Sequence, residues 1–308
     1  GVIRENIYGV DIQPIATEIS RLRCFLTLIV EERIDDSLEN RGIEPLPNLD
    51  FKFVTANSLI GLPNTQNASL FKDKTGIDQL KDIRNQFFSS VNSERHHLKD
   101  EFKEIQKQML LRMIEMKGSD DVTQKLSTWD PFSSKMTPWF DPEWMFGIED
   151  KFDLVIGNPP YVKKEHLDEE TVSALDQAYS EQVKGKEKHW SDDLYVHFIF
   201  RGLELAKHGG ILTYITNDSF VGLASKERVR ALMFSNSLRE LIRCPSETFD
   251  ATIYTAVFVL QKKESVTRTY QSGYFDYPSF EYRDLGTVAY DAAIAMPGKR
   301  LMFANPMM

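Results

Sequence analysis

The chain has 308 residues, of which 42% are hydrophobic and 27% charged, a composition typical of a soluble protein with one large or two ordinary domains. No apolar run reaches transmembrane length and no secretory signal is visible, so we expect a cytoplasmic protein without a membrane partner. Cys24 and Cys244 are too few for a disulfide framework or a zinc site. The net charge of −9 requires any DNA-binding face to be local or to lie outside this chain.

The first 31 residues predict a strand followed by a helix. The strand covers residues 7–12 and carries Asp11, and Pro14 opens a helix that runs to Glu31 with apolar residues at helical spacing. An acid at the end of a strand in a nucleotide-binding sheet can accept both hydroxyls of a ribose. Taken alone, Asp11 fits better as a helix N-terminal acid that the helix dipole stabilises.

A further strand is predicted over residues 51–56, and Asn57 follows it directly. The side chain of Asn57 could hold a nucleobase amine at this strand end. An ordinary turn residue is the simpler interpretation of Asn57 when it is considered by itself.

Residues 62–150 interrupt the alternation of strands and helices. This segment is rich in charge and has a helical core from about Ile77 to Met116. Its apolar stripe consists of Phe87, Val91, Leu98, Phe102, Ile105, Met109, Leu110 and Met113. We predict a helical-hairpin insertion that packs on the sheet domain or on a neighbouring domain. A DNA clamp or a coiled-coil contact is the alternative.

The stretch FDLVIGNPPY, residues 152–161, is the most informative part of the chain. The apolar, β-branched run from Asp153 to Ile156 is typical of a buried parallel strand, which Gly157 ends. The loop that follows therefore stands at a carboxyl end, where open α/β sheets bind their ligands.

The loop itself is chemically restrictive. Pro159 and Pro160 fix φ and remove two N–H donors, so the loop offers carbonyl groups without competing donors. The Asn158 side-chain oxygen and the Pro159 carbonyl can converge on one amino group, with Tyr161 flat against a ring. A planar amine that accepts a methyl group needs two such acceptors while its lone pair turns towards the electrophile. A rigid Pro-Pro turn is the structural alternative.

The segment after the loop is highly charged and includes Lys163, Lys164, Lys184, Lys186 and Lys188. Phosphate contact and a solvated loop are equally compatible with this composition. Residues 191–193 then predict the cap of a helix that Gly209 and Gly210 end.

Beyond the glycine pair we predict a strand over 211–215, a helix over 226–241, and strands at 241–243 and 254–260. Phe249 stands just before the last of these strands. It could stack on a base pulled out of a duplex, opposite Tyr161. Without further context, a core aromatic that anchors the loop is the favoured interpretation.

The ordered set of these features resembles the γ-type N6-adenine DNA methyltransferases. Within them it looks most like the methylase region of type IIG fused restriction-modification enzymes or their phage-defence relatives. The phrases IYGVDIQPIATEISRLR, FDPEWMFGIEDKFDLVIGNPPYV and HGGILTYITNDSF carry the likeness, which covers residues 3–263. It implies an α/β, Rossmann-like S-adenosylmethionine-dependent methyltransferase sheet in residues 1–61 and 151–263, a helical insertion in 62–150, and the start of a connection to a target-recognition domain in 264–308.

The resemblance also implies roles for single positions. Asp11 matches the acid that holds the ribose of S-adenosylmethionine, and the other cofactor-binding residues implied are Ile12, Asn57, Ser58 and Asn158. The catalytic residues implied are Asn158, Pro159, Pro160 and Tyr161, and no metal ligand is among them. Tyr161 and Phe249 match the aromatics that stack on the target base. Asp193, Leu194 and Tyr195 match the segment beneath the methionine and target pocket.

One departure from the family is large. Its glycine-rich cofactor loop, of the form D-P-A-C-G-S-G, follows a first strand upstream of the strand acid, but only ten residues precede Asp11 here. That strand is central in the family's sheet, so we expect two buried-type edges to be unpaired. We therefore expect a fragment of a longer polypeptide, inactive alone and weak in cofactor binding.

The activity implied for the parent enzyme is site-specific methylation of adenine N6 in double-stranded DNA, gripped mainly by regions outside this chain. The base is flipped out for the reaction, and the sulfonium carries the charge, so the transfer needs no metal. The parent could also be an endonuclease. The alternatives are a protein-glutamine N5 methyltransferase, which the long insertion argues against, and a catalytically silent scaffold module.

Overall fold

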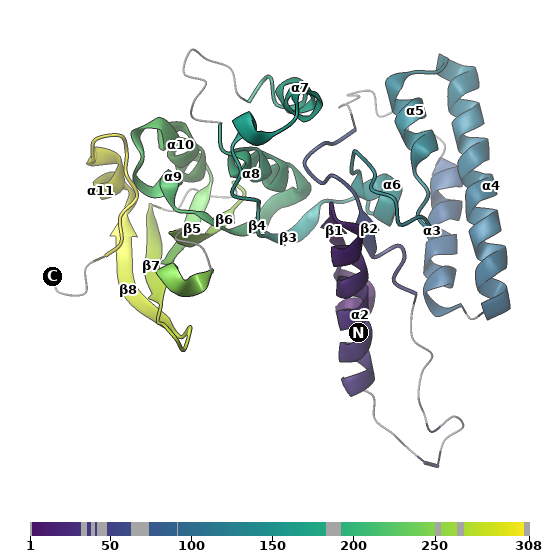
Figure 1. Ribbon diagram of the computed structural model, residues 1–308, viewed down its shortest axis with the longest axis horizontal. Coiled ribbons are helices and arrows are strands. Elements are labelled where there is room, and N and C mark those ends of the chain that lie inside the picture. The colour runs from purple at the N-terminus through teal and green to yellow at the C-terminus, as the bar shows by residue number, and fades with distance from the viewer. Residues whose placement is uncertain are drawn as a thin grey trace. The chain divides into compact units, whose positions relative to one another are not determined.

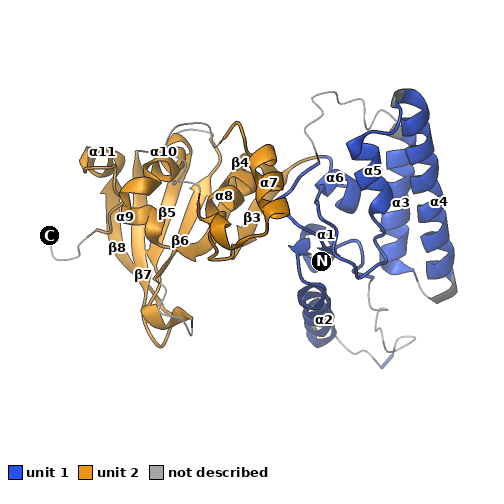
Figure 2. Cartoon of the chain, turned by 45° about the horizontal axis from the view of Figure 1, so that its top comes forward, with its two compact units in different colours: residues 1–149 blue, residues 150–308 orange. Residues whose placement is uncertain are grey.

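The computed structural model describes residues 2–31, 36–37, 41, 48–62, 74–90, 92–182, 192–249, 254–263 and 268–304. The chain divides into two compact units, residues 1–149 and residues 150–308 (Figure 2). Each unit has its own sheet and helices, so the α/β class predicted from the sequence is confirmed. The finer division into a discontinuous domain and an insertion stays a prediction.

Unit 1 begins with α1 (Val2–Asn6), β1 (Gly9–Asp11) and α2 (Pro14–Glu31), and β1 pairs in parallel with β2 (Phe53–Thr55). The helix has the predicted bounds, whereas both strands are shorter than predicted. Their ladder joins only three residue pairs, from Gly9 opposite Phe53 to Asp11 opposite Thr55. Glycine is required at position 9, because an added Cβ would lie 2.5 Å from the Phe53 ring.

The helical part of unit 1 contains α3 (Lys74–Ser89), α4 (Asn92–Lys117), α5 (Asp121–Thr128) and α6 (Pro142–Phe146). The helical core predicted over 77–116 consists of two helices, α3 and α4, which lie side by side as in a helical hairpin (Figure 1). The break is stabilised at Ser90, because the Asn48 side-chain amide donates to the carbonyls of Phe87 and Ser90 over 2.6 and 3.1 Å. These contacts satisfy carbonyl groups that the end of a helix leaves free.

The predicted apolar stripe packs inside unit 1. Its buried members are Phe87, Leu98, Phe102, Met109 and Met113, while Ile105 and Leu110 are partly buried and Val91 lies outside the described residues. The buried guanidinium of Arg84 lies 5.2 Å from the centroid of the Phe102 ring. Helices α3 and α4 therefore use this stripe to form an aromatic core.

Unit 2 holds a six-stranded sheet in the order β3-β4-β6-β5-β7-β8 (Figure 1). Its strands are β3 (Phe152–Gly157), β4 (Ala206–Asn217), β5 (Ser237–Arg243), β6 (Thr255–Gln261), β7 (Thr269–Phe275) and β8 (Tyr282–Ala289). Among these strands, β3, β4, β5 and β7 point in one direction, and β6 and β8 are antiparallel to them. The carboxyl ends of β3, β4, β5 and β7 therefore share one edge of the sheet.

The helices of unit 2 are α7 (Glu169–Ala178), α8 (Leu194–Leu205), α9 (Ser219–Gly222), α10 (Glu227–Ser235) and α11 (Tyr290–Ala295), and its short 3-10 turns are η2 (Lys164–His166), η4 (Ala224–Lys226) and η5 (Ser246–Thr248). Two predicted helix ends were wrong. Helix α8 ends at Leu205 because the chain pairs with β3 from Ala206 onwards, and α10 ends at Ser235 because β5 starts two residues later. The close approach requires Gly210, where a Cβ would lie 3.0 Å from the Phe152 carbonyl oxygen.

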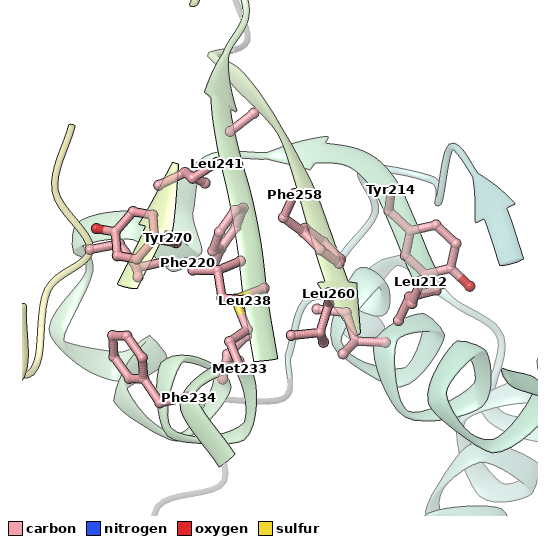
Figure 3. Close-up of a cluster of buried hydrophobic side chains, with 14 of the residues drawn as sticks. Leu212, Tyr214, Phe220, Met233, Phe234, Leu238, Leu241, Phe258, Leu260 and Tyr270 are labelled. Carbon is pink, nitrogen blue, oxygen red and sulfur yellow. The ribbon is translucent and has the colours of Figure 1, made fainter. Parts of the chain in front are cut away.

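The core of unit 2 lies between this sheet and its helices (Figure 3). Strands β4, β5 and β6 contribute Leu212, Leu241, Phe258 and Leu260, and Phe220 packs edge-on against Phe258 with 5.8 Å between ring centroids. Tyr270 of β7 is also buried in this cluster, so residues after position 263 extend the same sheet.

Strand β3 departs from the prediction of a buried strand. Leu154 is 53% exposed and Ile156 is 75% exposed. Leu154 and Ile156 share the exposed face of β3, which is the last strand in the order of the described strands, whereas Val155 on the opposite face packs against the core. The expected unpaired edges are thus present among the described residues, since β1 likewise pairs with β2 alone.

Helix α2 also exposes an apolar stripe. Its members Ile15, Ile19, Leu22, Leu26 and Ile29 are each between 45 and 64% exposed. They recur every three or four residues and so share one side of the helix. Even so, neither α2 nor any other helix of the described ranges is long and apolar enough to cross a membrane.

Candidate functional site

The Asn158–Tyr161 loop follows β3 at the shared carboxyl edge of the unit 2 sheet. Pro159 is buried, whereas Asn158 and Pro160 are exposed and Tyr161 is half-buried. The Tyr161 hydroxyl donates a hydrogen bond to the Asn158 side-chain oxygen over 3.0 Å. A carbonyl oxygen has two lone pairs, so this bond leaves Asn158 able to accept one more.

The rings of Tyr161 and Phe249, the two residues that the family resemblance pairs as stacking aromatics, lie close together and edge-on. Their ring centroids lie 5.9 Å apart and their planes meet at 77°. A base between two parallel rings needs about 3.5 Å on each side, or about 7 Å in total. One ring must therefore turn before a base can lie between them.

The surroundings of Tyr161 keep its hydroxyl protonated. Burial raises the pKa of this group to about 12, and the nearby Cys244 thiol adds to the shift. The hydroxyl is thus a hydrogen-bond donor at neutral pH, consistent with its bond to Asn158.

The start of α8 anchors the segment that follows Tyr161. The Leu194 amide donates to the Val162 carbonyl over 2.9 Å, and the Lys164 amide donates to the Asp192 carbonyl over 2.8 Å. An isolated antiparallel β-bridge also pairs the backbones of Lys163 and Asp193. The loop's downstream side is therefore fixed to α8 by backbone contacts.

Asp193 does not cap α8 with its side chain, contrary to the expectation from the sequence. Its carboxylate instead forms an ion pair with the Lys226 ammonium, which is 2% exposed. Near this pair, the hydroxyls of Tyr195 and Ser219 are hydrogen-bonded over 3.1 Å. Sequence reasoning missed Lys226 because a single lysine in the charged run SKER carries no signal of burial.

The other lysines near the loop do not form a free cationic surface. Lys164 pairs with Asp176 over 2.5 Å and its side chain is 16% exposed, while Lys163 lies 3.8 Å from the Glu165 carboxylate. Lys184, Lys186 and Lys188 lie outside the described residues.

Four of the five predicted cofactor-binding residues, Asp11, Ile12, Asn57 and Ser58, lie at the end of the β1–β2 sheet in unit 1, whereas Asn158 belongs to unit 2. The Asp11 carbonyl accepts from the Ala56 amide over 2.9 Å, and its exposed carboxylate accepts from the Gln13 amide through one oxygen over 2.8 Å. The Asn57 side-chain oxygen accepts from the Leu59 amide over 3.1 Å. Ile12 is exposed and Ser58 is partly buried beside them.

These contacts suit the simpler interpretations, since Asp11 precedes a helix and Asn57 forms a turn. They also leave the second carboxylate oxygen of Asp11 and the side-chain amide of Asn57 without a hydrogen bond to any described residue. A ribose and an adenine would find an acceptor and a donor there. The donor set therefore fits a nucleoside.

Comparisons with known proteins identify the family to which this chain belongs and several similar proteins. A family model described as Eco57I restriction-modification methylase matches residues 5–249. A Methanocaldococcus jannaschii protein assigned as the type II restriction enzyme and methyltransferase RM.MjaORFECS2P is 25% identical over 85% of this chain and 26% of its own length. The type II restriction enzyme and methyltransferase RM.Eco57I of Escherichia coli is 32% identical over 37% of this chain and 11% of its own length.

Among solved structures, the type IIG restriction endonuclease BpuSI is similar to 50% of this chain and 19% of its own, with a TM-score of 0.35 and 18% identity. The chain thus spans about a quarter or less of the length of each of these relatives.

Proposed function

Since the chain belongs to the Eco57I restriction-modification methylase family, we propose that it is the methylase part of a larger restriction-modification or phage-defence enzyme, which transfers a methyl group from S-adenosylmethionine to the N6 amine of adenine in duplex DNA. One observation carries this proposal. The exposed Asn158 side chain lies at the carboxyl edge of the sheet and accepts a hydrogen bond from Tyr161. The Phe249 ring lies next to the Tyr161 ring, with 5.9 Å between their centroids.

The loop acts on the amine through acceptors. Asn158 keeps one lone pair on its side-chain oxygen, and the Pro159 carbonyl accepts no hydrogen bond from a described residue. Together these oxygens would bind the two hydrogens of an exocyclic amine, and the nitrogen lone pair would then be directed away from the two oxygens and towards the electrophilic methyl group. Positive charge that develops on the nitrogen would strengthen both bonds.

Cofactor binding is assigned to unit 1. Asp11 would accept the ribose hydroxyls through its second oxygen, and Asn57, with Ile12 and Ser58 beside it, would contact the adenine. S-adenosylmethionine supplies an electrophilic methyl group on a sulfonium when it is bound.

The aromatic pair acts on the target base. A base extruded from the duplex loses its stacking at a cost of a few kcal/mol, which stacking on protein rings offsets. Tyr161 and Phe249 would provide this stacking after one ring turns.

Transfer of labelled methyl groups tests the proposal, with the full-length protein offered DNA and protein acceptors in parallel. We expect label in DNA, at adenine N6. Label in protein glutamine instead would favour an N5 methyltransferase, and no transfer to either would favour a scaffold. Asn158→Ala should lower the single-turnover rate roughly 10²- to 10³-fold with cofactor affinity unchanged, because one preorganised acceptor is lost. Asn158→Asp retains acceptor oxygens and is the matched control.

A further inference from the structure

A cavity of about 270 Å³ lies in unit 2, next to the candidate site. Arg243 and Cys244 at the end of β5, Tyr274 and Phe275 at the end of β7, and Phe303 form most of its wall. The parallel register places Arg243 opposite Tyr274. The cavity therefore lies on the same sheet edge as the Asn158–Tyr161 loop.

The chain that leaves β5 connects this cavity to the candidate site, because Cys244 lines the cavity and Phe249, five residues later, lies 5.9 Å from the Tyr161 ring. The family match ends at residue 249, so Tyr274, Phe275 and Phe303 lie beyond it. Neither the match nor the candidate site explains these three aromatic residues.

The segment that carries Phe303 is held by hydrogen bonds at the residues before and after it, Met302 and Ala304. The Tyr270 hydroxyl donates to the Met302 carbonyl over 2.7 Å and accepts from the Met302 amide over 2.9 Å. The Ala304 amide donates to the Ser272 hydroxyl over 3.0 Å. Tyr270 and Ser272 are both buried, so the ring stands on a rigid support.

The chemistry of the cavity is that of a stacking site with one cationic group. The Arg243 guanidinium lies 4.5 Å from the centroid of the Phe303 ring. It is exposed and interacts electrostatically with Asp218, but no hydrogen bond or ion pair joins it to a residue in the described ranges, so its five N–H groups are available to a ligand. Tyr274 lines the cavity and is 36% exposed.

Size narrows the class of ligand. Sites for drug-sized molecules measure about 300 to 1,000 Å³, and this cavity is slightly smaller. The cavity suits one planar ring system, with an anionic group outside the cavity next to Arg243. A complete nucleoside cofactor would be too large for it. An apolar side chain from another polypeptide would fill the space but leave the Arg243 donors unmatched.

We infer that this cavity binds a second nucleobase of the DNA, near the target adenine, with Arg243 on the phosphate of the same nucleotide. The inference rests on the proposed function and extends it. A base held there stacks against Phe303 and Tyr274 while the target adenine occupies the Asn158–Tyr161 loop. The cavity then fixes the DNA strand beside the reacting base.

Photocross-linking tests this inference in the full-length protein. The probe is a mixture of amplified genomic fragments that carry 5-iododeoxyuridine in place of thymidine, so that many sequences are present. Near-ultraviolet light joins this base to an aromatic ring stacked on it, and mass spectrometry identifies the residue. We expect cross-links at Tyr274, Phe275 or Phe303.

Three variants sharpen the test. Tyr274→Ala should lower the yield at Phe303 about 10-fold, as expected for loss of one stacking partner. Arg243→Ala should lower it as well and raise KM for DNA. Tyr277→Ala removes an exposed aromatic from the same hairpin and should leave the yield unchanged.

Methyl transfer measured in parallel separates the two proposals. Transfer to DNA without cross-links in the cavity, or with cross-links at Tyr161 and Phe249 alone, would overturn the cavity's role and leave the proposed function standing. Absence of both methyl transfer and cross-links would overturn both.

Discussion

The Tyr161 hydroxyl donates a hydrogen bond to the side-chain oxygen of Asn158, the atom that would accept a hydrogen from the target amine. Two donors on one carbonyl oxygen are compatible, because the oxygen has two lone pairs. The bond also fixes the rotation of the Asn158 amide group, so the oxygen and not the nitrogen is presented at that position.

Tyr161→Phe therefore tests orientation separately from stacking. The variant keeps the ring and loses the bond, so we expect the single-turnover rate to fall by no more than about 10-fold, the value of one neutral hydrogen bond. Tyr161→Ala also loses the ring, and DNA affinity should fall by a further factor of about 10 or more. Equal losses in the two variants would show that the ring does not stack on the base.

Lys226→Met tests the buried ion pair with Asp193. Removal of one partner leaves a charge without its counterpart, which costs about 3–5 kcal/mol in buried pairs. We expect a loss of this size in the free energy of unfolding, measured in urea. Lys299→Met breaks the exposed pair with Glu227 and should cost at most about 1 kcal/mol. Similar losses in both variants would contradict a special role for Lys226.

His197 predicts a dependence of stability on pH. Burial lowers its pKa to about 4 from a usual value of 6.5, and the nearby Lys164 ammonium adds to the shift, while Asp176 and the Asp193 backbone oppose it. Between these two pH values the unfolded chain binds a proton that the native protein does not. The free energy of unfolding should therefore decrease as the pH falls through this window.

His197→Phe should remove this part of the dependence, since phenylalanine does not titrate. Relative to the variant, the native sequence should lose up to about 3 kcal/mol between neutral pH and the acid end of the window. Urea unfolding at a series of pH values measures the difference. Parallel curves for the two proteins would refute the assignment.

The sequence was most informative where one local rule dominated. Helix α2 was predicted with the right bounds, because Pro14 fits the first turn and the apolar spacing is regular. The loop at Asn158 was placed after β3 because Gly157 and two prolines exclude continuation of the strand. The family resemblance named Tyr161 and Phe249 as one aromatic pair, and their rings are neighbours that meet edge-on, while their stacking on a base stays a prediction.

Features set by tertiary contacts were not predictable. The switch from α8 to β4 at Ala206 depends on pairing with β3, and the break between α3 and α4 depends on the distant side chain of Asn48. Strands β7 and β8 were not predicted because apolar and polar residues do not alternate regularly in their sequences, TYQSGYF and YRDLGTVA. The exposure of Ile156 depends on which face of β3 packs against the core and has no local signature.

The position of β6 has a consequence for biosynthesis. This strand lies between β4 and β5 although it follows both in the chain. During translation, the ribosome therefore delivers β4 and β5 before the strand that joins them, and the sheet closes only after residue 261 has emerged. A nascent chain that stalls earlier exposes two unsatisfied ladders to chaperones and proteases, and the edge that carries Asn158 and Arg243 is assembled late.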